Sequence, residues 1–227
     1  MTVWSRISDL GQMFGEGLTH TIERLGVKSK PPEKSVAFTI AMIALGAKMA
    51  KADGQVTDDE VVAFSQVFHV PQKDLAAVTR VFNQAKQDVA GYEVYAAQVV
   101  KLFGLKSHVL ETVLDGLFHI AKADNVLHPG ELEFLEKVSA IFGFAGADWL
   151  RIRARHVAVK DDPFEILGVA ADAKSAVIKK RYRQLAKELH PDMQIAAGVP
   201  QEMVRLATER LTQINAAYSE LEHMGAV

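Results

Sequence analysis

The residues best placed to do chemistry form a tripeptide near the end of the chain, His190-Pro191-Asp192. The carboxylate of Asp192 can accept two hydrogen bonds from an arginine of another molecule. His190 can contact the same partner or hold the shape of the loop, and Pro191 keeps the loop rigid, which lowers the entropy cost of docking. We interpret this tripeptide, the tip, as a protein-binding feature, because the surrounding chain offers no convincing active site.

A basic stretch leads directly into the tip. Its positive side chains are Lys179, Lys180, Arg181, Arg183 and Lys187. Residues 161–227 contain more acidic than basic residues, so the positive charge is concentrated on this stretch. Runs of charge are usually solvated helix faces, and that interpretation stays open. Beside the tip we favour a binding surface that steers an acidic partner.

Two helices are predicted before the tip. Asp162 can cap a short helix that has Pro163 at its first position, and Gly168 can close it. Asp172 can cap the next helix, which runs to about Leu189. Both starts are predicted because an acidic side chain satisfies the free backbone N–H groups of a first helical turn.

An antiparallel hairpin is predicted around the tip. Pro191 ends the helix before it, and a final helix runs from about residue 201 to residue 223. Apolar stripes on the two helices face each other: Ile178, Leu185 and Leu189 on one, and Leu211, Ile214, Tyr218 and Leu221 on the other. Phe164 and Leu167 buttress the hairpin, and Tyr182 belongs to its core rather than to a contact surface.

These segments resemble a J domain, the module of DnaJ-type co-chaperones, over residues 162–221. J domains stimulate ATP hydrolysis by DnaK-type seventy-kilodalton chaperones. The resemblance implies that the tip binds such a chaperone, at an arginine near the junction of its nucleotide and substrate domains. One departure is Met193, which stands where J domains often carry a basic residue, and the loop that follows it, 194–200, is rather apolar. This departure bears on affinity and on the choice of partner.

Residues 33–158 are predicted to form a separate helical bundle, since no segment alternates as a half-buried strand does. The segment 50–60 recurs as 121–131, and each copy lies between two apolar helical runs. The repeat predicts two halves with pseudo-twofold symmetry that bury each other's apolar faces. The chain is therefore expected to be all-α.

The bundle resembles the TerB-like helical domain associated with tellurite resistance, which also precedes a C-terminal J domain in DjlA-type co-chaperones. The match rests on Lys51 to Gly54 with Glu60, and on Lys122 to Asp124 with Glu131. TerB-like domains have been linked to divalent metals, which makes Asp53, Glu60, Asp124 and Glu131 candidate metal ligands. The same acids also suit the starts of helices, and the spacing does not fit an EF-hand.

Residues 1–32 carry one amphipathic stripe that several glycines weaken. This segment can dock on its own protein or dimerise, which we favour, or lie on a membrane surface. No stretch reaches the roughly 18 apolar residues that a membrane span needs. The net charge of −2 argues against nucleic acid as a partner, and the absence of cysteine excludes disulfides and thiolate zinc sites.

We therefore expect an all-α protein with an amphipathic segment (1–32), a TerB-like domain (33–158) and a J domain (161–227). Its expected function is that of a co-chaperone, not itself an enzyme, which recruits a DnaK-type chaperone and accelerates its ATP hydrolysis. The first domain would serve localisation, dimerisation or client contact. We expect a cytoplasmic protein, with association at the cytoplasmic membrane face as a weaker option. The alternative is a metal-binding or stress-responsive helical protein whose hairpin is only structural; no other cofactor is expected.

Overall fold

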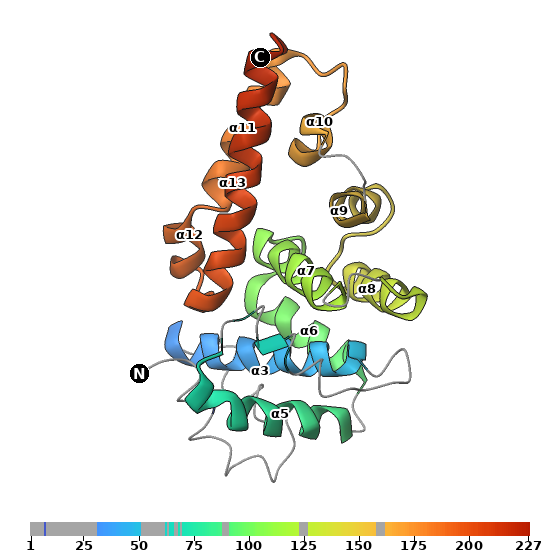
Figure 1. The fold of residues 1–227 in the computed structure, drawn as a ribbon, viewed down its shortest axis with the longest axis vertical. Coiled ribbons are helices and arrows are strands. Elements are labelled where there is room, and N and C mark those ends of the chain that lie inside the picture. Colours follow the sequence, from blue (N-terminus) through green and yellow to red (C-terminus); the bar gives the residue numbers. More distant parts are fainter. Residues whose placement is uncertain are drawn as a thin grey trace.

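A computed structural model gives the fold of the chain (Figure 1). It describes residue 7, residues 31–50, residues 62, 64, 65, 68 and 70–87, and residues 91–122, 127–157 and 162–227. All regular structure in these residues is helical, which confirms the predicted all-α class. The elements are α3 (Pro31–Ala50), η2 (Gln72–Asp74), α5 (Leu75–Gln87), α6 (Tyr92–Phe103), α7 (His108–Ala121), α8 (Pro129–Ile141), α9 (Ala147–Val157), α10 (Pro163–Leu167), α11 (Ser175–Glu188), α12 (Pro191–Ala196) and α13 (Gln201–His223).

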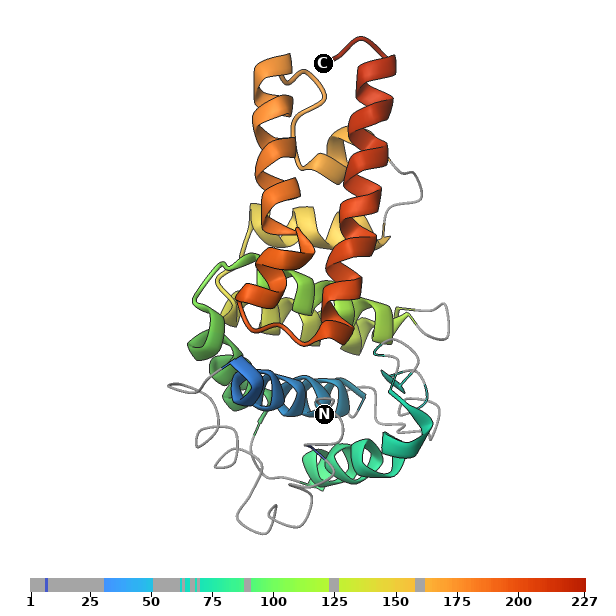
Figure 2. The same cartoon turned by 90° about the vertical axis from the view of Figure 1, so that its left-hand side faces the viewer.

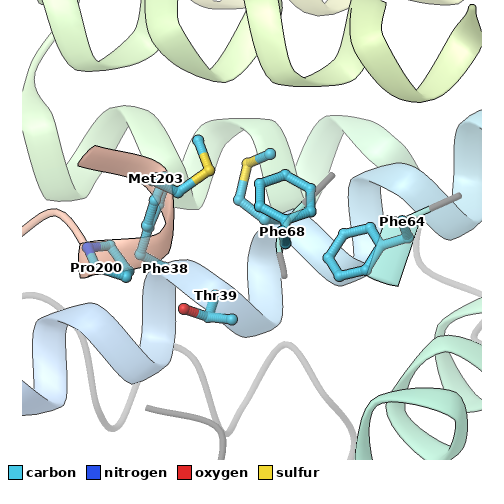
Figure 3. Close-up of a pocket in the computed structure, with 7 residues that line it drawn as sticks. Phe38, Thr39, Phe64, Phe68, Pro200 and Met203 are labelled. Atoms are coloured by element: carbon cyan, nitrogen blue, oxygen red, sulfur yellow. The ribbon is translucent and has the colours of Figure 1, made fainter. Parts of the chain in front are cut away.

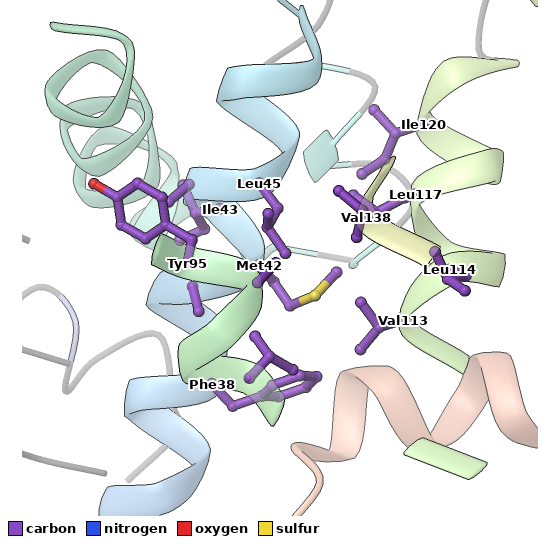
Figure 4. Close-up of a cluster of buried hydrophobic side chains, with 14 of the residues drawn as sticks. Phe38, Met42, Ile43, Leu45, Tyr95, Val113, Leu114, Leu117, Ile120 and Val138 are labelled. Carbon is purple, nitrogen blue, oxygen red and sulfur yellow. The ribbon is translucent and has the colours of Figure 1, made fainter. Parts of the chain in front are cut away.

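Helix α3 is the centre of the first bundle. Its side chains from Val36 onward are almost all buried, as expected of a helix that is apolar on every side. Helices α5 and α6 pack along it, and α7 and α8 add further contacts. Figure 4 shows Met42 of α3 directed towards Val113 of α7, with Tyr95 of α6 on the other side of α3. Ile7 is buried in the same cluster.

The C-terminal hairpin folds as predicted. Helices α11 and α13 lie side by side and run in opposite directions (Figure 2). Their core contains most of the predicted stripe residues: Leu167, Ile178, Leu185, Leu189, Ile214 and Leu221 are buried, and Phe164, Tyr182, Leu211 and Tyr218 are partly buried against them. The rings of Tyr182 and Tyr218 stack with their centroids 4.0 Å apart, and Tyr182 packs, partly buried, against the core of the hairpin.

The predicted signals around α10 are also present. The carboxylate of Asp162 accepts a hydrogen bond from the backbone N–H of Phe164 at 2.8 Å, and Pro163 opens the helix. Gly168 closes it in the left-handed conformation, with φ of 67°. The left-handed backbone favours glycine at this position, and a Cβ added there would lie 2.9 Å from the Cδ of Arg151, so the arginine side chain would have to shift.

Two predictions about the hairpin were wrong. Asp172 does not cap α11, because the helix begins three residues later, with Lys174 at the N-cap position and no side-chain cap. The loop predicted over residues 194–200 contains the end of another helix, α12. Pro191 ends α11 as predicted, but a proline is equally suited to the first position of a helix, and His190 caps the new helix.

The hairpin packs against the first bundle. Val199, Met203 and Leu206 are buried in the large core of the bundle rather than in the core of the hairpin. The approach between α13 and α7 is close: a Cβ added at Gly116 would lie 3.2 Å from the Cδ1 of Leu206. The start of α13 therefore belongs to the hairpin by sequence and to the bundle by packing.

Three predictions fall largely outside the described residues. The first copy of the internal repeat, 50–60, is described only at residue 50, the amphipathic segment 1–32 only at residues 7, 31 and 32, and the boundary near residues 158–161 not at all. The pseudo-twofold symmetry of the bundle accordingly stays a prediction.

Candidate partner-binding site

The tip connects two helices through a capped turn. His190 occupies the N-cap of α12, and its Nδ1 accepts a hydrogen bond from the backbone N–H of Asp192 at 3.2 Å. Pro191 fixes the backbone between these residues. The imidazole thus holds the shape of the loop, which is one of the two roles predicted for it.

The carboxylate of Asp192 points to solvent, and its side chain is 86% exposed. Within the described part of the chain, its ion-pair contact is with His190, whose Nδ1 lies 3.7 Å from Oδ2. This Nδ1 accepts a hydrogen bond from the backbone N–H of Asp192, so it does not donate one to the carboxylate. Both carboxylate oxygens are therefore available for a two-pronged hydrogen bond from an arginine.

Gln194 anchors the far side of the turn. Its side chain is fully buried, and its Nε2 donates to the backbone oxygen of Glu188 at the end of α11 at 2.8 Å. The backbone oxygen of Gln194 accepts from the N–H of Val199 at 3.1 Å. The tip is thus held both by the cap at His190 and by a buried amide, which limits its motion relative to α11.

The positive side chains predicted on α11 divide into two sets. Lys180, Arg183 and Lys187 are exposed, and their spacing of three and four residues places them on one helix face that leads to the tip. We call these three residues the basic stripe. No ion pair to them occurs within the described residues. Lys179 is half-buried.

Arg181 lies on a different face of α11. Its Nε donates to the backbone oxygen of Leu167 at 3.2 Å. Burial lowers the pKa of this guanidinium, and the positive charge of Arg151 lowers it further. Arg181 therefore holds the hairpin against α10, whereas the basic stripe faces solvent.

Sequence reasoning missed a second group of charges. We call it the interdomain ion cluster, and it consists of Glu111 and Asp115 on α7, Arg151 and Arg155 on α9, and Arg210 on α13. The Oε1 atom of Glu111 accepts hydrogen bonds from Arg151 and Arg155, each at 2.6 Å, and from Arg210 at 2.8 Å. Asp115 accepts from Arg155 through Oδ1 and from Arg210 through Oδ2, both at 3.1 Å.

Each acid in the cluster is held in its charged form. Burial alone would raise the pKa of Glu111, but the guanidinium groups of Arg210, Arg155 and Arg151 outweigh this effect and hold the pKa well below its usual range. Asp115 follows the same pattern, with burial opposed by Arg155 and Arg210 and by a hydrogen bond with His156 at 2.8 Å. The cluster therefore joins α13 to α7 and α9 by fully ionised pairs.

A signal for this cluster was present in the sequence. Glu111 and Asp115 stand four residues apart on a helix whose other residues from 109 to 118 are uncharged, and Arg151 and Arg155 repeat this spacing on α9. Acids inside an apolar helix face need partners, so complementary pairs of this kind predict that two helices meet. Nothing in the sequence singles out Arg210, because its partners lie on another domain.

The candidate metal ligands do not gather in the described residues. Asp53, Glu60 and Asp124 lie outside them, and Glu131 accepts a hydrogen bond from the backbone N–H of His128 at 3.0 Å, which caps the start of α8. Among the described residues, no three or more His, Asp or Glu side chains come together in a way that could hold a metal ion.

A small cavity lies where α13 meets α3 (Figure 3). Its lining is mostly apolar and consists of Phe38, Thr39, Met42, Phe64, Phe68, Pro200 and Met203. Its volume of about 10 Å³ is room for about one water molecule, so it is too small for a ligand.

Across the part of the chain that the structure describes, no helix is long and apolar enough to cross a bilayer.

Comparison with known families assigns both halves of the chain. Residues 39–154 match the family model for the tellurite resistance protein TerB, and residues 162–224 match the model for the DnaJ domain. The chain belongs to the TerB family and carries a C-terminal DnaJ domain. The TerB match ends within α9, and the DnaJ match begins at Asp162, which caps α10. The interdomain ion cluster thus joins the TerB domain to the DnaJ domain.

Several relatives match the chain over most of its length and most of their own. The chain is 25% identical to the "Co-chaperone protein DjlA" of Photobacterium profundum, over 84% of this chain and 79% of that protein. It is 25% identical to the protein of the same name from Vibrio cholerae, over 85% and 80%. The Coxiella burnetii protein of that name is 26% identical, over 86% and 80%. No solved structure matches the chain.

Proposed function

We propose that this protein is a co-chaperone whose DnaJ domain binds a DnaK-type chaperone and stimulates its ATP hydrolysis. The observation that carries the proposal is the solvent-facing carboxylate of Asp192, 86% exposed on a capped turn. The match to the DnaJ domain and the co-chaperone name of the relatives support the same assignment.

The contact would combine one directed bond with general attraction. Asp192 would accept a two-pronged, charge-assisted hydrogen bond from an arginine of the chaperone. The basic stripe would draw an acidic surface of the chaperone towards the tip and speed the encounter. Because the tip is already rigid, little conformational entropy would be lost on docking.

The TerB domain would serve localisation, self-association or contact with a client. The DnaJ domain packs on the TerB domain through the ion cluster and through the start of α13. This packing would hold the tip at a defined position relative to whatever the TerB domain binds.

The test is the steady-state ATPase rate of a DnaK-type chaperone with and without the full chain. We expect the wild-type chain to raise the rate and Asp192→Asn to abolish the increase. Asp172→Asn is the matched control, because it removes an exposed carboxylate from the same domain away from the tip, and it should stimulate like the wild type. Normal stimulation by Asp192→Asn would contradict the role assigned to Asp192.

A further inference from the structure

Helix α12 exposes large apolar side chains next to the tip. Met193 is 43% exposed and Ile195 is 55% exposed, although Gln194 between them is fully buried. Apolar residues commonly turn inward and polar ones outward, so this arrangement is the reverse of the usual one. Folding of the hairpin does not explain it, because α12 packs on α11 and α13 while both apolar side chains stay about half exposed.

The helical geometry places these two side chains on either side of Asp192. Successive residues in a helix are turned by about 100° around its axis. On the outer surface of α12 the order is therefore Ile195, Asp192, Ala196 and Met193, and all four are exposed. The carboxylate of Asp192 thus projects from a short surface that is otherwise apolar.

We propose that Met193 and Ile195 form an apolar collar that packs against the DnaK-type chaperone around the bond made by Asp192. The inference rests on the proposed function and deepens it by defining the surface of the chaperone that this chain recognises. That surface would have an arginine surrounded by apolar side chains, next to an acidic region that meets the basic stripe. A charge-assisted hydrogen bond is stronger where water is excluded, and contacts that ring such a bond supply that exclusion.

The surroundings of the collar favour this occupant. The carboxylate at its centre calls for a cationic group, which an arginine supplies and an anionic lipid surface does not. The collar is also continuous with the tip, and the tip with the basic stripe, so one partner can cover all three. Met193 occupies the position where many J domains have a basic residue, so the collar gives this chain a means to select its chaperone.

The test is a titration of the same ATPase with the full chain and with Met193→Ser/Ile195→Ser. The concentration that gives half-maximal stimulation should rise about ten-fold, the effect expected from losing two partly buried apolar side chains at an interface. The maximal rate should be retained, because Asp192 is intact. The ratio of the two half-maximal concentrations should be similar at low and high salt, since apolar contacts are not screened.

Val177→Ser/Met224→Ser is the matched control. Both residues are exposed in the same domain, by 51% and 62%. Val177 lies in the first turn of α11 and Met224 directly follows α13, so both are at the end of the hairpin opposite α12. The control should titrate like the wild type. Met193→Gln, a milder single change, should raise the half-maximal concentration about three-fold and covers the case in which the double variant folds poorly.

The outcomes separate the two proposals. Absence of stimulation by the wild-type chain overturns the proposed function, and the collar with it. Stimulation by the wild type with half-maximal concentrations within two-fold for both collar variants overturns the collar alone. A fall in molecular mass of the double variant on light scattering would assign the face to a second copy of the chain and overturn the collar as well.

Discussion

The interdomain ion cluster and the tip with its basic stripe are built from the same kinds of side chain but differ in their surroundings. Glu111, Asp115 and Arg210 are each less than 10% exposed, and every charge among them has a partner within 3.1 Å. Asp192 is 86% exposed, and Arg183 and Lys187 are also exposed. The first group is satisfied within the chain, whereas the second is available to another molecule.

The cost of removing charges from water explains this difference between the buried and the exposed charges. Taking a charge out of water is costly unless a partner compensates, so a buried cluster is stable only where each charge keeps a partner of opposite sign. Exposed charges keep their hydration and contribute little to folding. A rigid arrangement of exposed charges therefore needs an explanation outside the fold, and binding supplies one. The predictions below test each side of this contrast.

Glu111→Gln should have the largest effect on stability. Three guanidinium groups face two carboxylates in the cluster, and this change leaves three positive charges against Asp115 alone. We expect a loss of about 3–5 kcal/mol in the free energy of unfolding, the range for an uncompensated buried charge. Denaturant unfolding measures it, and a loss below about 1 kcal/mol would refute this account of the cluster.

Arg210→Met should cost less, although it removes the one member of the cluster that belongs to the DnaJ domain. Two arginines then face two carboxylates, so the remaining charges are balanced. We expect a loss of about 2 kcal/mol, mainly from hydrogen bonds to charged groups. The matched control is Arg205→Met, an exposed arginine on the same helix, which should change stability by less than about 0.5 kcal/mol.

Arg210→Met should also loosen the docking of the DnaJ domain on the TerB domain. The chain has no cysteine, so Leu105→Cys/Val177→Cys provides one exposed labelling site on each domain. Energy transfer between two dyes should report a single narrow distance in the otherwise wild-type chain and a broader one with Arg210→Met. An unchanged distribution would mean that the apolar contacts of α13 suffice for docking.

Arg183→Ala/Lys187→Ala should leave stability unchanged and weaken binding. At low salt we expect the half-maximal concentration for ATPase stimulation to rise about ten-fold, because part of the steering field is lost. The difference should shrink as salt rises. Lys73→Ala/Arg80→Ala removes the same charge from exposed positions near α5 and should have little effect. Equal losses from both variants would show that net charge matters and the stripe does not.

Mild acid should have the smallest effect on domain docking. The pKa values of Glu111 and Asp115 are lower in the folded chain than when unfolded, so their stabilisation is fully present above the ordinary carboxyl range. It is lost only as pH falls below that range and through the folded values. The dye distance should therefore stay constant from pH 7 down to about pH 5. A change within that interval would show that another titrating group controls docking.

Local signals predicted much of the DnaJ domain. Asp162, Pro163 and Gly168 act within a few residues of their own positions, so the sequence specifies their roles directly. The tip was found for the same reason. Helix α12 was missed because Pro191 both ends one helix and opens another, and only the cap from His190 decides that a helix follows.

Other contacts between distant segments, beyond the facing apolar stripes of the hairpin, were not predicted. Arg181 and Arg210 look like other surface arginines in the sequence, and their roles depend on Leu167 and on α7, which only the folded chain brings near. The assignment of Val199, Met203 and Leu206 to the larger core has the same origin. Their apolar character predicts burial, but not the surface against which they are buried.

The most direct test of the contrast compares two variants, Asp192→Asn and Asp115→Asn. Each is measured in denaturant unfolding and in stimulation of the chaperone's ATPase. The account predicts that Asp192→Asn keeps the wild-type unfolding midpoint and loses stimulation, whereas Asp115→Asn shifts the midpoint to lower denaturant concentration. Wild-type stimulation by Asp192→Asn, or a midpoint shift as large as that of Asp115→Asn, would contradict the claim that Asp192 is held outward for a partner.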